Sequence, residues 1–226
     1  MGTIEGYEPS FDQNAEARAE AAPALKLYGT TTSPYTRKVR ILGRAAGYAV
    51  ALVDTRTEEG AAALARLAPL GKVPVAELPG APSPVVLPDS GLIAAWLWER
   101  HAAAMRAAGF AAPAVGSAAD WAERELVLVV EGALDAAINR FYLLRDQLPD
   151  QGYVTRQRDR VSTTLAWLDA RMPAFARPLS PAALSLGCAL DWMVFRDVTD
   201  LVRFPRLVTF REAWKASGVG AGTEPA

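Results

Sequence analysis

Strand-like patterns occur only in the first part of the chain, whereas every long pattern after residue 118 is helical. The run LKLYGT at 25–30 alternates and ends in turn formers, which predicts a strand. The segment 33–47 then places apolar residues at i, i+4 and i+7, which indicates one face of a helix. A second strand is predicted over 48–54 and a second helix over 58–69. The chain therefore opens with a βαβα unit.

The pattern changes after the second helix. The runs VPVAEL at 73–78 and VVL at 85–87 are joined by a Pro- and Gly-rich stretch, which predicts an antiparallel hairpin. A helical pattern follows over 91–101. The resulting order, βαβαββα around a mixed four-stranded sheet, is typical of a thioredoxin-like domain. We assign this α/β domain to residues 25–104.

Composition divides the rest of the chain. The charged residues within 1–24 are mostly acidic, and the segment lacks the apolar core of a signal peptide. This composition predicts a disordered lead. Residues 105–118 are rich in Ala, Gly and Pro and predict a linker. An all-α domain is expected over 119–216, followed by a flexible tail at 217–226. The helices expected in that domain cover 120–148, 153–172, 181–195 and 204–214.

The charge balance gives no sign of a nucleic-acid or membrane partner. The 24 Lys and Arg residues against 25 Asp and Glu leave a formal net charge of -1, so no basic footprint for phosphate groups is predicted. No apolar run approaches the roughly 20 residues that cross a bilayer. We expect a cytoplasmic protein that binds a small molecule or another protein chain.

The chain has few residues suited to thiol or metal chemistry. Its one cysteine, Cys188, lies in an apolar helical pattern that predicts inert packing. Its one histidine, His101, is expected at the surface. A single cysteine excludes an internal disulfide and a Cys-x-x-Cys redox or zinc centre. No metal site is predicted, and thiol chemistry would need a thiol supplied by a ligand.

The segment SPYT, which begins at Ser33, is the first candidate site. Serine followed by proline is a strong helix start, because the hydroxyl caps free amides and proline has a preset φ. That structural reading is sufficient by itself, and the cations that follow would then form a solvated face. In a thioredoxin-like fold, however, this helix N-terminus is where a cysteine thiolate is stabilised. Ser33 and Thr36 replace both cysteines, which suits stabilising a thiolate that belongs to a ligand.

Four motifs in order resemble those of the cytosolic glutathione transferases. They are SPYTRKVR after the first strand, GKVPV at the third, LPDSGLIAAWL at the third helix, and LSPAALSLGCALDWMVFR, which is similar to the family's sixth helix. The likeness spans about residues 25–215 and is to bacterial and plant classes with a serine in an SPxxRKVR-like stretch. One departure is Ala183, which replaces the acid of the capping box that begins at Ser180. The resemblance implies a detoxification enzyme in which the Ser33 hydroxyl stabilises the glutathione thiolate.

The resemblance also implies binding roles for the other motifs. A cis peptide before Pro74 would turn the backbone of Val73 toward glutathione, although a plain strand boundary also explains this proline. Lys72 would meet a carboxylate, or would simply be exposed. Asp89 and Ser90 would hold the ammonium and carboxylate of the γ-glutamyl group, and either could also be an ordinary N-cap.

The second substrate implied by the resemblance is a small hydrophobic electrophile. Tyr35, Trp121 and Tyr142 are its candidate pocket residues, although such aromatic residues are more often core. A homodimer is implied as well. The reaction subtype stays open between conjugation, dehalogenation, ether cleavage, isomerisation and peroxide reduction.

Two other classes of function are consistent with the same fold. In a noncatalytic binding or assembly module, Ser33 would only cap a helix. A glutaredoxin-like thiol transferase needs a cysteine of its own near residue 33, and this sequence has none there, so it ranks last.

Overall fold

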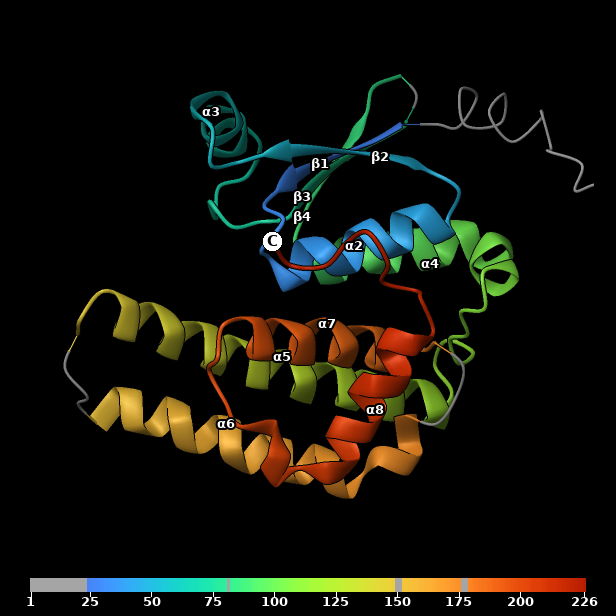
Figure 1. Ribbon diagram of the computed structural model, residues 1–226. Coiled ribbons are helices and arrows are strands. Elements are labelled where there is room, and N and C mark those ends of the chain that lie inside the picture. Colours follow the sequence, from blue (N-terminus) through green and yellow to red (C-terminus); the bar gives the residue numbers. More distant parts are fainter. Residues whose placement is uncertain (1–23, 81, 149–151, 176–178) are drawn as a thin grey trace, which may run out of the picture.

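A four-stranded sheet with flanking helices forms the first half of the described chain, and a group of long helices forms the second (Figure 1). The computed structural model describes residues 24–80, 82–148, 152–175 and 179–226. The predicted lead at 1–24 lies outside the described residues except for Ala24, which begins the first strand.

The first domain has the predicted order βαβαββα. The sheet order is β2-β1-β3-β4, in which β1 pairs parallel with β2 and antiparallel with β3, and β3 pairs antiparallel with β4. The predicted thioredoxin-like plan is therefore confirmed. Its elements are β1 (Ala24–Gly29), α2 (Pro34–Ala45), β2 (Ala49–Asp54), α3 (Glu58–Leu67), β3 (Val75–Leu78), β4 (Val85–Pro88) and α4 (Ser90–Ala107).

The two faces of the sheet are covered by different helices because side chains alternate along a strand. Leu25 and Leu27 of β1 belong to the apolar cluster that α2 and α4 complete. Tyr28 points the other way and packs with Val75 and Ala63, under α3. One face of the sheet therefore rests on α2 and α4, as Figure 1 shows.

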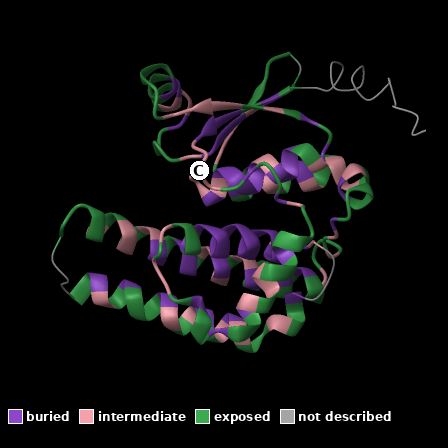
Figure 2. Cartoon of the chain, in the orientation of Figure 1, coloured by how far each residue is buried: buried purple, intermediate pink, exposed green. Residues whose placement is uncertain are grey.

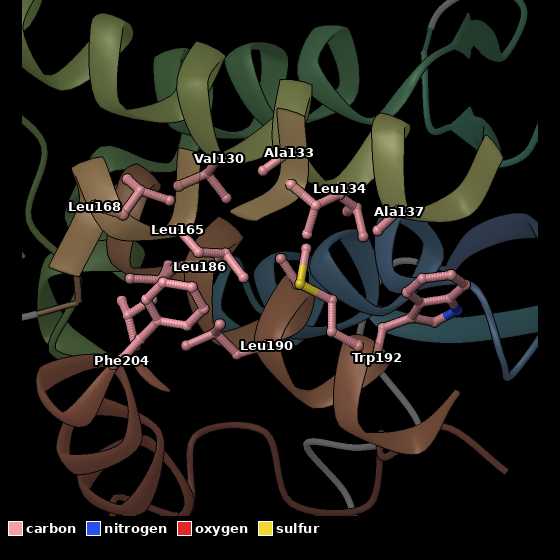
Figure 3. Packing of buried hydrophobic residues seen from close by; sticks show 14 of the residues in the cluster. Val130, Ala133, Leu134, Ala137, Leu165, Leu168, Leu186, Leu190, Trp192 and Phe204 are labelled. Carbon is pink, nitrogen blue, oxygen red and sulfur yellow. The ribbon is translucent and has the colours of Figure 1, made fainter. Parts of the chain in front are cut away.

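The second domain consists of helices, as predicted, and α7 is at its centre. Every residue of α7 from Ala182 to Met193 is buried, and Figure 2 shows this burial along most of the helix. Leu186 and Leu190 of α7 pack with residues of α5 and α6, as Figure 3 shows. The helices and short 3-10 turns are α5 (Ala118–Arg145), α6 (Gly152–Ala170), η1 (Met172–Phe175), α7 (Pro181–Phe195), η2 (Leu201–Arg203) and α8 (Pro205–Ala216).

The helix α4 is longer than the predicted range of 91–101. It continues to Ala107, so its last turn occupies the start of the predicted linker, and Met105 in that turn is fully buried. The helix is kinked at His101, where φ is -122° and ψ is 26°. His101 is half-buried and not simply a surface residue. Its Nε2 lies 2.9 Å from the Tyr48 hydroxyl, within hydrogen-bond distance.

The interface between the domains is formed by α2, and here the interpretation of a solvated cationic face is wrong. Arg37 and Lys38 are only 3% and 4% exposed. Lys38 forms an ion pair with Glu131 of α5, and Arg37 Nη1 donates to Asp191 Oδ2 of α7 at 2.6 Å. The cations are buried because α2 packs against the sheet with one face and against α7 with another.

Asp191 is the centre of a buried polar network. Besides Arg37, its carboxylate accepts hydrogen bonds from Arg211 Nε at 2.7 Å and from Trp214 Nε1 at 3.1 Å, both on α8. A carboxylate with three donors is well compensated for its loss of water. The network therefore joins α2, α7 and α8.

The last ten residues of the chain, predicted to be a flexible tail, have specific contacts in the structure. Arg40 Nη2 donates to the carbonyl of Gly222 at 2.9 Å, and Arg44 Nη1 donates to that of Ala221 at 3.1 Å. Thr223 is buried. The segment approaches α2 closely at Gly220, where a Cβ would lie 2.7 Å from Arg37 Nη2.

Replacement of Asp191 by alanine is expected to destabilise the protein strongly. The change would leave Arg37 buried without its ion-pair partner, which costs about 3–5 kcal/mol. Urea unfolding followed by circular dichroism measures this loss. The matched control is Asp159→Ala, which removes an exposed pair with Arg158 and is expected to cost less than about 1 kcal/mol. Equal effects of the two variants would contradict this account of the interface.

Candidate functional site

The sheet register brings three of the predicted motifs to one edge. Tyr28 at the end of β1 pairs with Val75 at the start of β3, and Val75 pairs with Pro88 at the end of β4. Ser33 follows β1, the Val73–Pro74 pair precedes β3, and Asp89–Ser90 follows β4. The Asp89 N–H also donates to the Pro74 carbonyl at 3.1 Å. Motifs that are up to 57 positions apart (33 to 90) are therefore neighbours at this edge.

Ser33 is the N-cap of α2. Its Oγ accepts a hydrogen bond from the Thr36 N–H at 3.1 Å, and Pro34 occupies the first helical turn. The Ser33 N–H donates to the Thr30 carbonyl at 3.2 Å and closes a turn over residues 30–33. Among the described residues, no atom accepts the hydroxyl proton of Ser33, which is half-buried. Ser33 is thus both a cap and a free donor at a helix N-terminus.

Thr36 occupies the second cysteine position of the Cys-x-x-Cys pattern, but its side chain does not lie at the site beside that of Ser33. Its side chain is fully buried and packs against Gly29. A Cβ at Gly29 would overlap with the Thr36 hydroxyl and methyl groups, so this close approach requires glycine there. Thr36 supplies a backbone N–H to Ser33, so of these two residues only Ser33 presents its hydroxyl at the edge.

The Val73–Pro74 peptide bond is cis, as the resemblance implied. Pro74 is buried, Val73 is half-buried, and Lys72 is exposed. In the part of the chain that the structure describes, the backbone N–H and C=O of Val73 form no hydrogen bond. They are consequently available to pair with an extended peptide.

Asp89 and Ser90 form the start of α4, as predicted. Asp89 Oδ1 accepts hydrogen bonds from the N–H groups of Gly91 at 2.8 Å and Leu92 at 3.2 Å, so the capping interpretation is confirmed. Asp89 has a φ of 76°, a conformation that costs a non-glycine residue about 1–3 kcal/mol and is concentrated at ligand sites. Its second carboxylate oxygen accepts no hydrogen bond from the described part of the chain, and Ser90 next to it is buried.

Tyr35 lies at the point where α2 meets α5. Its phenol donates to Asp135 Oδ1 at 2.6 Å. Burial, together with this hydrogen bond and the charge of Asp135, raises the pKa of Tyr35 well above its usual range. The phenol is therefore neutral and directed at Asp135, so it does not serve as a thiolate donor.

The structure does not bring the other two aromatic candidates equally close to Tyr35. Trp121 lies 14 residues before Asp135 on α5 (135 − 121), which is about 21 Å along a helix. Tyr142 lies 7 residues after Asp135 (142 − 135), or about two turns. Both side chains are exposed. Measured along α5, Tyr142 therefore lies nearer than Trp121 to the contact between Tyr35 and Asp135.

Two acidic residues of α5 were not identified from the sequence. Glu131 pairs with Lys38, and Asp135 accepts from Tyr35. Glu131 and Asp135 are four residues apart on α5, and their partners Lys38 and Tyr35 are three residues apart on α2. Both spacings place side chains on one face of a helix, so the two pairs lie side by side along the contact. The spacing is visible in the sequence, but its pairing with a helix about 100 positions away is not.

Cys188 lies beside this contact, in a buried position of α7. Burial raises the pKa of its thiol to about 12. Within the described ranges, no group of three or more His, Cys, Asp or Glu side chains is placed to hold a metal ion. No described helix has both the length and the apolar character to span a bilayer.

The first domain matches a known family model. Residues 27–105 match the model described as glutathione S-transferase, N-terminal domain. No curated protein matches the chain.

Three solved structures have the same overall architecture. A glutathione transferase family member from Pseudomonas fluorescens Pf-5 with bound glutathione has 28% identity and a TM-score of 0.76, covering 90% of this chain and 100% of that one. A structure described in the same words but with bound S-(propanoic acid)-glutathione has 27% identity and a TM-score of 0.72, with coverages of 90% and 100%. A glutathione S-transferase from Methylobacillus flagellatus KT with glutathione bound has 25% identity and a TM-score of 0.74, with the same coverages. The two-domain architecture of this chain is the glutathione transferase fold.

Cys188 is expected to be unreactive in the folded protein. With a pKa of about 12, the native thiol holds about three orders of magnitude less thiolate near pH 8.5 than a free cysteine does. Alkylation by iodoacetamide, followed by mass spectrometry, should proceed in denaturant and be very slow without it. Rapid labelling of the native protein would contradict the assignment of Cys188 to inert packing.

Proposed function

We propose that this protein is a glutathione transferase in which the Ser33 hydroxyl stabilises the thiolate of bound glutathione. One observation carries the proposal: Ser33 offers a free hydroxyl at the N-terminus of α2, at the sheet edge that also holds Val73–Pro74 and Asp89–Ser90. The glutathione-bound structures of similar proteins support it. The protein is proposed to act in the cytoplasm on a small hydrophobic electrophile.

The chemistry required of Ser33 is modest. A free thiol titrates near pKa ~8.5, so only a few per cent is thiolate at neutral pH. Lowering that pKa by about two units makes most of the thiol reactive and needs about 1.4 kcal/mol of differential stabilisation per unit. A helix N-terminus and one charge-assisted hydrogen bond can provide this. The Ser33 hydroxyl would donate a hydrogen bond to the sulfur and would not itself attack.

The other two motifs are proposed to hold the peptide. The free N–H and C=O of Val73 would pair with the glutathione backbone, as an added strand does. Asp89 would bind the ammonium group with its second oxygen while its first caps α4. The Ser90 hydroxyl and N–H would bind the α-carboxylate, and Lys72 would meet a carboxylate from the exposed side.

The electrophile is proposed to bind where α2 meets α5. Tyr35 offers aromatic surface there, with its phenol held by Asp135, and Tyr142 lies about two turns further along α5. The thiolate would attack an electrophilic carbon, form a carbon–sulfur bond and expel the leaving group with its electron pair. The bound S-(propanoic acid)-glutathione in one similar protein supports a site that accommodates a thioether of glutathione.

Replacement of Ser33 by alanine is expected to reduce conjugation about 100-fold near neutral pH, since the thiol pKa would rise by about two units. Glutathione binding, measured by calorimetry, should change by only a few-fold. Conjugation is measured with a chromogenic aryl halide. The loss of the cap itself costs about 1 kcal/mol of stability.

Two control variants separate catalysis from capping. Ser117→Ala removes the corresponding N-cap of α5, whose hydroxyl accepts from the Asp120 N–H at 3.1 Å, and should preserve conjugation. Tyr35→Phe should also preserve the thiol pKa, because the phenol points at Asp135. If the wild type binds no glutathione and Ser33→Ala only loses stability, the transferase proposal is wrong. The protein is then better described as a noncatalytic binding or assembly module.

A homodimer is also proposed, and exposed apolar side chains support it. They lie on the edge strand β4, in the first turn of α4 and in the first half of α5, namely Val85, Val86, Leu92, Trp121 and Leu128. A contiguous exposed apolar patch commonly marks a contact surface, and we propose that these side chains belong to one.

Light scattering after gel filtration should give a mass about twice the 24.2 kDa of one chain. The variant Leu92→Lys should shift the population toward single chains, because a lysine would place a charge within the contact. The matched control is Val202→Lys, since Val202 is an exposed apolar residue on η2. A wild-type mass of one chain would exclude the dimer.

A further inference from the structure

The segment 220–226 runs along α2 toward the candidate site. In Figure 1 the chain passes from α8 across α2 and ends beside the start of that helix. Three arginines of α2 contact it, and they lie on one helix face because they are spaced by three and four residues. These side chains are Arg37, Arg40 and Arg44.

The buried anchor of this segment is Thr223, which is 1% exposed. Its Oγ1 accepts a hydrogen bond from Arg37 Nε at 3.1 Å and donates to the carbonyl of Gly220 at 2.6 Å. A Cβ at Gly220 would lie 2.7 Å from Arg37 Nη2, so the segment approaches the guanidinium as closely as glycine permits. Arg37 therefore binds Asp191 with one nitrogen and the segment with another.

The far end of the segment contacts the turn that carries Ser33. Thr31 Oγ1 donates to the backbone oxygen of Ala226 at 2.7 Å. Thr31 is a central residue of the turn 30–33, which the Ser33 N–H closes on Thr30. The segment thus links a buried anchor to the residues immediately before the candidate thiolate donor.

The contact at Thr31 contributes little to overall stability, because it is a single exposed hydrogen bond. Its effect on geometry is larger. A hydrogen bond weakens steeply when its angle departs from linearity, and the direction of the Ser33 hydroxyl depends on the backbone of this turn. Holding Thr31 in place restricts that backbone.

We propose that the segment 220–226 orients the turn 30–33 so that the Ser33 hydroxyl points at the glutathione thiol. Thr223 and Thr31 are then positioning residues, the first by anchoring the segment and the second by receiving its end. This inference rests on the proposed glutathione transferase function. Loosening the segment weakens the hydrogen bond to the thiolate and raises the pKa of the bound thiol.

Three variants test this role in the full protein. Thr31→Val removes the exposed contact and keeps the side-chain shape. A chain that ends at Thr223 retains the anchor and loses the contact with the turn. Thr223→Val loosens the anchor, although it also leaves Arg37 with one acceptor fewer. The matched control is Thr209→Val, whose hydroxyl donates to the Pro205 carbonyl within α8.

The readouts are the pH dependence of conjugation and the Kd for glutathione. In Thr31→Val and in the shortened chain, we expect a three- to tenfold loss of conjugation near neutral pH and an apparent thiol pKa about 0.5–1 unit higher, the range that one net hydrogen bond covers. The Kd should rise less than conjugation falls. Thr209→Val should match the wild type in both readouts.

Each other outcome has a definite meaning. If wild type conjugates glutathione and the variants keep its thiol pKa, the positioning role is wrong, whatever happens to their melting temperatures. If wild type binds no glutathione at all, the proposed function fails and this inference fails with it. A lower melting temperature of Thr223→Val with an unchanged thiol pKa would make the segment purely structural.

Discussion

The ion pair between Arg37 and Asp191 is the interaction on which the arrangement of the two domains depends. It joins α2 of the first domain to α7 of the second, at positions where both side chains are almost completely buried. Arg211 and Trp214 complete the carboxylate's hydrogen bonds. A buried pair that loses one partner is strongly destabilised, so the network tolerates little change in how α2 sits on α7. The position of the N-terminus of α2 is consequently well defined.

That position matters because α2 belongs to both halves of the proposed site. Its first residue follows Ser33, at the edge where β1, β3 and β4 meet. Its second residue, Tyr35, reaches α5 through Asp135. A thiol held by the first domain and an electrophile held against the second would therefore meet at one helix end. The segment 220–226 also contacts α2, through Arg37. It runs from the end of α8 to Thr31, in the turn 30–33.

Much of the fold could be predicted from the sequence because local patterns determine it. The alternation in LKLYGT, the serine–proline start of α2 and the Pro- and Gly-rich turn before VVL each specify an element with little help from the rest of the chain. The capping roles of Ser33 and Asp89 follow from the same local chemistry. The end of α4 could not be predicted in this way, since its last turn is held by tertiary packing around Met105.

The sequence by itself determined the order of elements, the caps and the absence of a thiol near Ser33, because each depends on residues adjacent in the chain. Only the tertiary structure decided that Arg37 and Lys38 are buried, that Tyr35 donates a hydrogen bond to Asp135, and that the glycine-rich end is bound along α2. The physical reason is that a charged residue is buried only when a partner is placed beside it. Here the partners Glu131 and Asp191 come from helices about 93 and 154 positions away, and no local pattern specifies which helix faces will meet.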